Sequence, residues 1–222
     1  MTTFPRFQAD SVSLAQLGVN ARGSGLIIGE TDDHQAAAID LLREEPTRAV
    51  VLGTLNLART VAFRCLGLGA RVLVSTWRPG PWAALARGAG VGPETFGLVD
   101  EGRLDAPDAD EATPLLVVHD HGSAPQETRI ATGPWRASLH VLTGLHPLTQ
   151  HLMAGADVLV LQQMDQRQGG NLVRLLSLPA PLIGRLSTLG PFQVLVVSRG
   201  GWQLVNLVST PSEVALLRSI GG

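Results

Sequence analysis

Residues 50–60, VVLGTLNLART, decide the fold of this chain. The stretch begins with β-branched apolar residues, turns at Gly53 and continues with leucines at helical spacing. Residues 71–76, RVLVST, and residues 81–87 repeat this order of strand and helix. Strands and helices that alternate in this way form a mainly parallel sheet through right-handed crossovers. We therefore expect a three-layer α/β fold with helices on both faces of the sheet.

The segments on either side of this unit predict the rest of the fold. Two apolar runs, 25–31 and 35–42, flank the turn-rich residues 32–34 and predict an N-terminal β-hairpin. Residues 210–213, TPSE, have the capping pattern of a helix start, and the acidic stretch 100–111 is expected to be a loop. The other expected strands are 48–53, 113–120, 137–142, 157–162 and the C-terminal hairpin 193–198 and 202–208, and the other helices are 55–68, 147–154, 170–178 and 182–189, all within one domain, 1–222.

The composition excludes several classes of protein. With 45% hydrophobic and 16% charged residues the chain is globular, and its net charge of −2 provides no basic stripe for nucleic acid. It has no apolar run long enough to span a bilayer, no signal-peptide pattern at its start and a single cysteine, Cys65, so we expect a cytoplasmic protein without disulfides. All basic residues other than histidine are arginine, which rules out a catalytic or phosphate-binding lysine.

The turn after residues 50–52 can be compared with a phosphate-binding loop. Such a loop needs two glycines, a lysine for the β- and γ-phosphates and a hydroxyl for Mg²⁺ at the helix start. On this pattern Gly53 matches the first glycine and Thr60 the hydroxyl. Ala58 replaces the second glycine and Arg59 the lysine, whose compact charge a planar guanidinium does not reproduce. Two interpretations remain open, an ordinary strand-to-helix turn and a degenerate phosphate loop.

The order of elements resembles the HerA/FtsK group of P-loop ATPases. Members of that group begin with a β-hairpin before the P-loop strand, and residues 25–41, GLIIGETDDHQAAAIDL, are similar to it. The group also tends to end with a strand hairpin and a short helix, as residues 193–217 do. Abundant alanine, glycine, leucine and arginine indicate a high-GC coding sequence. Within the group, this apolar, high-GC character looks like that of proteins associated with actinobacterial type VII secretion. The resemblance implies a P-loop NTPase-like fold.

The same resemblance implies a second motif, a strand that ends in two acidic residues for Mg²⁺ and for the attacking water. The matching strand here ends in His119 and Asp120, and histidine is a poor replacement for an oxygen ligand of Mg²⁺. Gln162 matches a polar sensor residue of the group. These departures from the motifs of the group imply that the chain has no catalytic residues and needs no cofactor. A nucleotide could still bind without being hydrolysed. The nucleotide pocket that the resemblance implies consists of Gly53, Thr54, Ala58, Arg59, Thr60, Asp120 and Gln162.

The sequence also contains residues that could form a metal site or a dinucleotide site. His119 and His121 lie two residues apart on a strand and could share a metal ion, with His146 or His151 as further ligands. Arg78 could meet the 2′-phosphate of NADP, but the glycine pattern of a dinucleotide site is missing after Gly53. Polar residues at strand ends explain the histidines better, so we assign no metal site.

Trp77, Arg78 and Trp82 form the strongest candidate for a partner-binding surface, because tryptophan and arginine anchor many interfaces. The two tryptophans could instead cover the edge of the sheet. The sequence thus predicts a non-hydrolysing P-loop-like structural or regulatory subunit, which acts through protein contacts or self-association in a secretion or translocation assembly. The alternative is a nucleotide-binding protein or small-molecule enzyme that uses a pocket at the carboxyl ends of the parallel strands.

Overall fold

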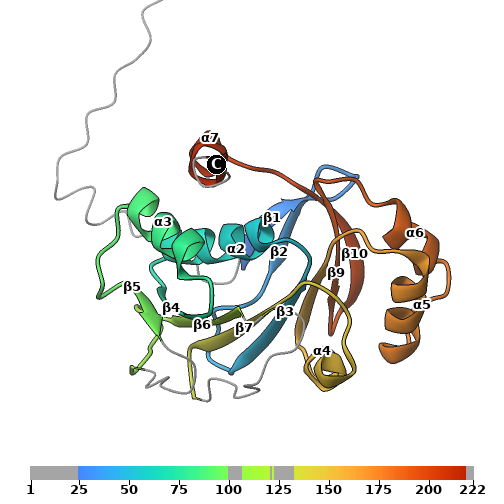
Figure 1. Cartoon of the computed structure of the whole chain (residues 1–222), viewed down its shortest axis with the longest axis horizontal. Coiled ribbons are helices and arrows are strands. Elements are labelled where there is room, and N and C mark those ends of the chain that lie inside the picture. The colour runs from blue at the N-terminus through green and yellow to red at the C-terminus, as the bar shows by residue number, and fades with distance from the viewer. Residues whose placement is uncertain (1–24, 100–106, 121, 123–132, 219–222) are drawn as a thin grey trace, which may run out of the picture.

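The computed structural model describes residues 25–99, 107–120, 122 and 133–218, which build a ten-stranded sheet with helices on both sides (Figure 1). This confirms the expected α/β fold. The strands are β1 (Leu26–Glu30), β2 (Ala36–Ile39), β3 (Thr47–Leu52), β4 (Arg71–Thr76), β5 (Phe96–Val99), β6 (Leu115–Asp120), β7 (Arg136–Leu142), β8 (Val158–Leu161), β9 (Gln193–Ser198) and β10 (Gly201–Leu207). The helices are α2 (Leu55–Gly67), α3 (Pro79–Ala89), the 3₁₀ turn η1 (Pro147–Thr149), α4 (Gln150–Ala154), α5 (Gln166–Leu175), α6 (Leu182–Thr188) and α7 (Pro211–Arg218).

The sheet has a parallel centre and an antiparallel extension. Its strand order is β2-β1-β10-β9-β8-β3-β7-β6-β4-β5. All pairs from β8 to β5 are parallel, whereas β9, β10, β1 and β2 are added antiparallel beside β8. The strand β3 that precedes Gly53 therefore lies in the interior, and one strand, β7, separates it from β6 and Asp120.

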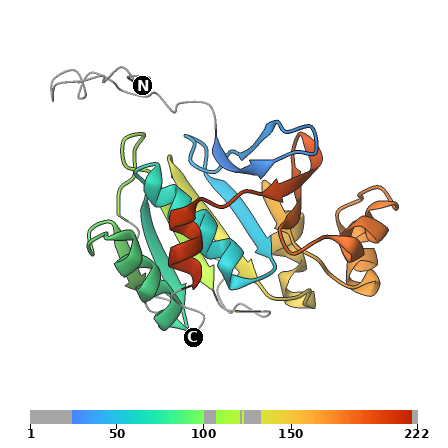
Figure 2. The same ribbon diagram turned by 90° about the horizontal axis from the view of Figure 1, so that it is seen from above.

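The side chains of β3 are buried alternately on the two faces of the sheet, as expected for a strand that helices cover on both sides. Ala49 and Val51 belong to a cluster with residues of α2, α3 and α7, such as Leu57, Trp82 and Leu216. Val50 and Leu52 belong to a second cluster with residues of α4, α5 and α6. The two views show these helix groups on opposite sides of the sheet (Figures 1 and 2).

The helix α7 is held across α2 and α3 by one ion pair and one close contact. Arg64 donates to both carboxylate oxygens of Glu213, at 2.5 and 2.9 Å, and Glu213 is only 2% exposed. A Cβ added at Gly88 would lie 1.9 Å from Leu216 Cδ1, so glycine lets this leucine approach α3. The last helix is therefore part of the packed structure.

Several boundaries differ from the sequence prediction, and one strand was missed; for example, the expected helix 147–154 is the 3₁₀ turn η1 followed by the short helix α4. The edge strand β5 was not expected, because a glycine interrupts its short apolar run, FGLV. The helix α5 begins at Gln166, four residues earlier than predicted, where Asp165 accepts a hydrogen bond from Gln168 N and caps it. Of the predicted loop 100–111, residues 107–111 contain no helix or strand and 100–106 lie outside the described residues. Within the described parts of the chain, no helix is both long and apolar enough to cross a membrane.

Candidate functional site

The turn that joins β3 to α2 consists of two residues, Gly53 and Thr54. The helix already begins at Leu55, so Ala58, Arg59 and Thr60 lie inside it and not in a loop. The match to the phosphate-loop pattern in the sequence predicted that these three residues surround a bound phosphate. Leucine and alanine favour helix at positions where a phosphate loop has flexible glycine, and Ala58 is fully buried against the core.

The amide side chain of Gln162 fills the turn. Its Oε1 accepts a hydrogen bond from Thr54 N at 2.6 Å. A Cβ added at Gly53 would lie 2.3 Å from the same oxygen, so only glycine leaves room for this contact. Gln162 follows β8, the neighbour of β3, and thus brings a polar oxygen to a backbone N–H that would otherwise be available to an anion.

Arg59 is a buried cation at the start of α2. Its side chain is only 2% exposed, and its Nη1 donates to Asn56 Oδ1 at 3.1 Å. Its Nε and Nη2 atoms are buried and have no hydrogen-bond partner among the described residues. Burial lowers the pKa of this guanidinium. Because the amino end of a helix is itself positive, a buried cation beside the first turn of α2 favours the binding of an anion.

Asp120, at the end of β6, is fully committed to protein contacts. The buried carboxylate accepts hydrogen bonds from Arg78 Nε at 2.9 Å, Arg78 Nη2 at 2.6 Å, Trp82 Nε1 at 2.7 Å and Thr76 Oγ1 at 3.0 Å. Burial by itself raises the pKa of Asp120, but the bonds from Arg78 and Trp82 outweigh it and the pKa is lowered. The carboxylate is thus ionised at neutral pH, and both of its oxygens are occupied.

His119 points to the opposite face of the sheet from Asp120, because successive strand residues alternate. Its ring stacks on that of His140, the paired residue of β7, with centroids 4.6 Å apart and planes 11° from parallel. His121 lies outside the described residues, so the His119–His121 pair stays a hypothesis. The other two candidates do not join it, since His146 Nδ1 accepts a hydrogen bond from Leu148 N and His151 is exposed on α4. The described residues contain no group of three metal-ligating side chains.

The Trp77–Trp82 segment divides into an exposed and a buried part. Trp77 is 69% exposed, with the Arg78 guanidinium 5.8 Å from its ring centroid. Trp82, which we proposed as a partner-binding residue, is completely buried. That assignment was wrong, because the first turn of α3 directs this indole inward to Asp120. Arg78 is likewise held by Asp120, and its pKa is raised mainly by that hydrogen bond, so it is not free for a 2′-phosphate.

No protein-family model matches the sequence, and no curated protein matches it either. Solved structures do match. VirB4 of Thermoanaerobacter pseudethanolicus has a TM-score of 0.58 at 11% identity, over 86% of this chain and 98% of that chain. The genome packaging NTPase B204 from Sulfolobus turreted icosahedral virus 2, in complex with AMPPCP, has a TM-score of 0.53 at 8% identity, over 74% and 98%.

A third match is the cytoplasmic domain of the Thermomonospora curvata type VII secretion ATPase EccC. Its TM-score is 0.52 at 13% identity, over 88% of this chain and 27% of that chain. The chain has the fold of FtsK/HerA-type P-loop ATPases. At these identities the similarity concerns the fold, and the residues of the site have to be judged by their own geometry.

Proposed function

We propose that this chain is a non-hydrolysing P-loop-like subunit that acts through protein contacts in a secretion or translocation assembly. The observation that carries the proposal is the network around Asp120. In a hydrolysing enzyme the second acidic residue at this strand end positions the attacking water, and the first helps to hold Mg²⁺. Here Arg78, Trp82 and Thr76 use the Asp120 carboxylate as a structural hydrogen-bond acceptor, and the preceding residue is His119.

The turn at Gly53 supports the same proposal. A phosphate loop binds through several backbone N–H groups that point at the ligand. The two-residue turn leaves no such loop, and the Thr54 N–H is already bonded to Gln162. The chain also lacks lysine. Loss of hydrolysis would thus follow from the backbone and from two polar contacts, and not from one substituted side chain.

The proposed role in an assembly is based on the proteins whose structures are similar to this chain. VirB4, B204 and EccC share the fold, and two of their names refer to genome packaging and type VII secretion. A related subunit without hydrolysis would serve such an assembly through its surface. Trp77 is the best-exposed tryptophan and is suited to anchor a partner or a second copy.

A second function is favoured by Arg59. Within the described part of the chain, Nε and Nη2 of this buried guanidinium have no hydrogen-bond partner, which is costly, and a bound anion would compensate the charge. Nucleotide or phosphate binding without turnover is therefore the alternative. It predicts a saturable increase in the melting temperature with ATP and Mg²⁺ that is lost in Arg59→Met.

Phosphate release from ATP tests the main proposal. We expect turnover at background for the wild-type chain and for the double variant Ala58→Gly, Arg59→Lys, because both changes fall inside a helix. The matched experiment uses Asp120→Asn, which should change stability and not turnover. An ordinary rate of about 1 s⁻¹ or more for the wild-type chain would refute the proposal.

A further inference from the structure

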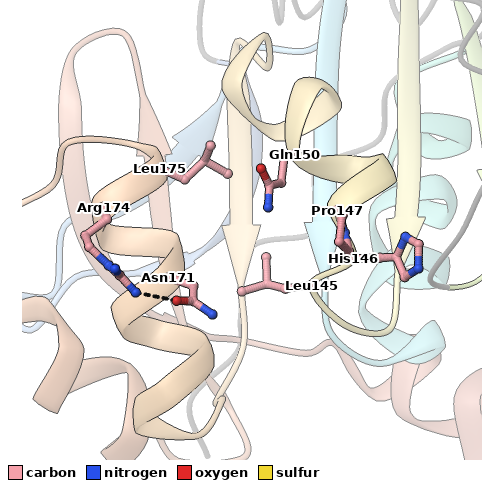
Figure 3. A pocket seen from close by; sticks show the side chains of 7 residues that line it. All are labelled: Leu145, His146, Pro147, Gln150, Asn171, Arg174 and Leu175. Atoms are coloured by element: carbon pink, nitrogen blue, oxygen red, sulfur yellow. Dashed lines mark hydrogen bonds between the residues drawn. The ribbon is translucent and has the colours of Figure 1, made fainter.

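A groove of about 490 Å³ lies between helix α5 on one side and η1 and α4 on the other (Figure 3). Part of its lining is apolar, since Leu145 and Leu175 line it and pack against the core cluster on that side of the sheet. Pro147 adds a third apolar side chain. Sites of this size hold small molecules, and they combine apolar surface with a few polar groups that orient the ligand. The groove therefore has room for the apolar body of a small molecule.

The α5 wall of the groove carries two linked donor groups, Asn171 and Arg174. Arg174 donates from Nη2 to Asn171 Oδ1 at 2.5 Å and from Nε to Gly170 O at 3.1 Å. Because arginine can only donate, the contacted atom is the amide oxygen, and the Asn171 amide nitrogen is left to face the gap (Figure 3). A cation bonded to an amide oxygen polarises the amide, so this N–H group is a strengthened donor. The third nitrogen of Arg174, Nη1, has no hydrogen-bond partner within the described residues.

The other polar groups of the groove add no negative charge. Among the described residues, none that lines it is acidic. The Nδ1 atom of His146 accepts a hydrogen bond from Leu148 N at 3.2 Å, so the neutral ring carries its proton on Nε2 and also offers a donor. Gln150, on the same wall, has an amide that can donate or accept. The carbonyl oxygens of residues 172–174, in the last turn of α5, all accept backbone hydrogen bonds and are not left to repel an anion. The lining thus suits a ligand with one negative charge, which Arg174 would compensate.

We propose that this groove binds a free small molecule that carries one carboxylate on an apolar body, such as a medium-chain fatty acid. The carboxylate accepts hydrogen bonds from Arg174 and Asn171, and the apolar body covers Leu145, Pro147 and Leu175. A nucleotide or another polyphosphate would bring more negative charge than the single arginine of the lining can compensate. The groove belongs to the side of the sheet that α4, α5 and α6 cover, whereas α2 covers the other side. The proposal therefore does not depend on whether the chain hydrolyses ATP.

Displacement of anilinonaphthalene sulfonate from the whole chain tests this proposal, because this fluorescent probe also joins one negative charge to an apolar body. We expect octanoate to displace the probe with a Kd of about 0.1 to 1 mM, and the neutral, equally shaped octanamide to bind at least about fivefold more weakly. Arg174→Gln should weaken octanoate about fivefold and leave octanamide unchanged, whereas Arg174→Lys keeps the charge and should lose about twofold. Arg167→Gln, exposed on the same helix but outside the lining, is the matched control and should behave like the wild type.

Asn171→Asp is a second variant, in which the new carboxylate pairs with Arg174 and takes the place of the ligand. It should weaken octanoate at least as strongly as Arg174→Gln, and the melting temperature of each variant is measured to show that it is folded. Equal displacement by octanoate and octanamide would overturn the proposal, as would an equal effect of Arg167→Gln or no saturable displacement below about 10 mM. A short peptide that ends in leucine with a free carboxylate, and that displaces the probe at a lower concentration than octanoate, would assign the groove to the end of a partner chain and would also overturn it.

Discussion

Replacing Asp120 by asparagine should destabilise the protein by about 2 to 3 kcal/mol. The change keeps the shape of the side chain but removes the charge that binds Arg78 through two nitrogens. Breaking a buried ion pair by removing one partner costs about 3 to 5 kcal/mol. The Arg78 side chain is 26% exposed, so hydration of its guanidinium offsets part of that loss of stability. For a protein of this size the remaining loss corresponds to about 4 to 12 °C in melting temperature.

Urea and thermal unfolding of the wild type and of Asp120→Asn measure this loss. Asp33→Asn, in the exposed turn of the N-terminal hairpin, is the control and should lie within about 0.5 kcal/mol of the wild type. A variant Asp120→Asn that is as stable as the wild type, or more stable, would refute the structural role of this carboxylate. Such a result would favour the other role proposed for Asp120, as a residue of the nucleotide pocket.

The pH dependence gives an independent check on the same group. The pKa of Asp120 is lowered in the folded protein, so its contribution to stability is fully present above the unfolded value of about 4. That contribution is lost as the pH falls through the folded pKa. The stability difference between the wild type and Asp120→Asn should therefore be complete at pH 7 and shrink below about pH 4.

Two further substitutions and one labelling experiment test contacts elsewhere in the protein. Gly53→Ala should cost about 1 to 2 kcal/mol because the new Cβ displaces Gln162 from Thr54, and urea unfolding should show a smaller cost in a Gln162→Ala background. Glu213→Gln weakens the bond to Arg64 and should make α7 more sensitive to limited proteolysis, whereas equal cleavage rates would contradict the role of this ion pair. Burial raises the pKa of the Cys65 thiol to about 12, so a thiol reagent should modify it in the folded protein only at the rate of unfolding, and rapid labelling would count against the packed interior.

The fold was largely predictable because its strands carry a strong local signal. The runs RAVVLG and QVLVVS are rich in β-branched residues and end in glycine or polar residues, and both form the expected strands β3 and β9. The strand β5 was not predicted, because its apolar run is only four residues long and contains Gly97. These four residues form a strand because they pair with β4 at the edge of the sheet, and their own sequence has little influence.

The site was less predictable, because its contacts join residues that are distant in the sequence. Gln162 and Asp120 were placed correctly at strand ends, but the sequence does not show that one caps the turn at Thr54 and the other binds Trp82. Trp82 was proposed as an interface residue because tryptophan and arginine anchor many interfaces, and the alternative that it covers the edge of the sheet was left open. Pro79, Gly80 and Pro81 open α3, with a proline at the start of the helix, and the indole then turns inward.

The position of β1 in the sheet has a consequence for the order of folding. Its two neighbours are β2, which follows it directly, and β10, where Gly29 pairs with Leu207. Nearly the whole described chain lies between these two residues, so the second pairing closes a very long loop. During synthesis the hairpin of β1 and β2 has no strand partner in the sheet until β10 has left the ribosome, and an isolated two-stranded hairpin is marginally stable in water. The parallel centre can assemble earlier, and the N-terminal hairpin would join the sheet last, although it is made first.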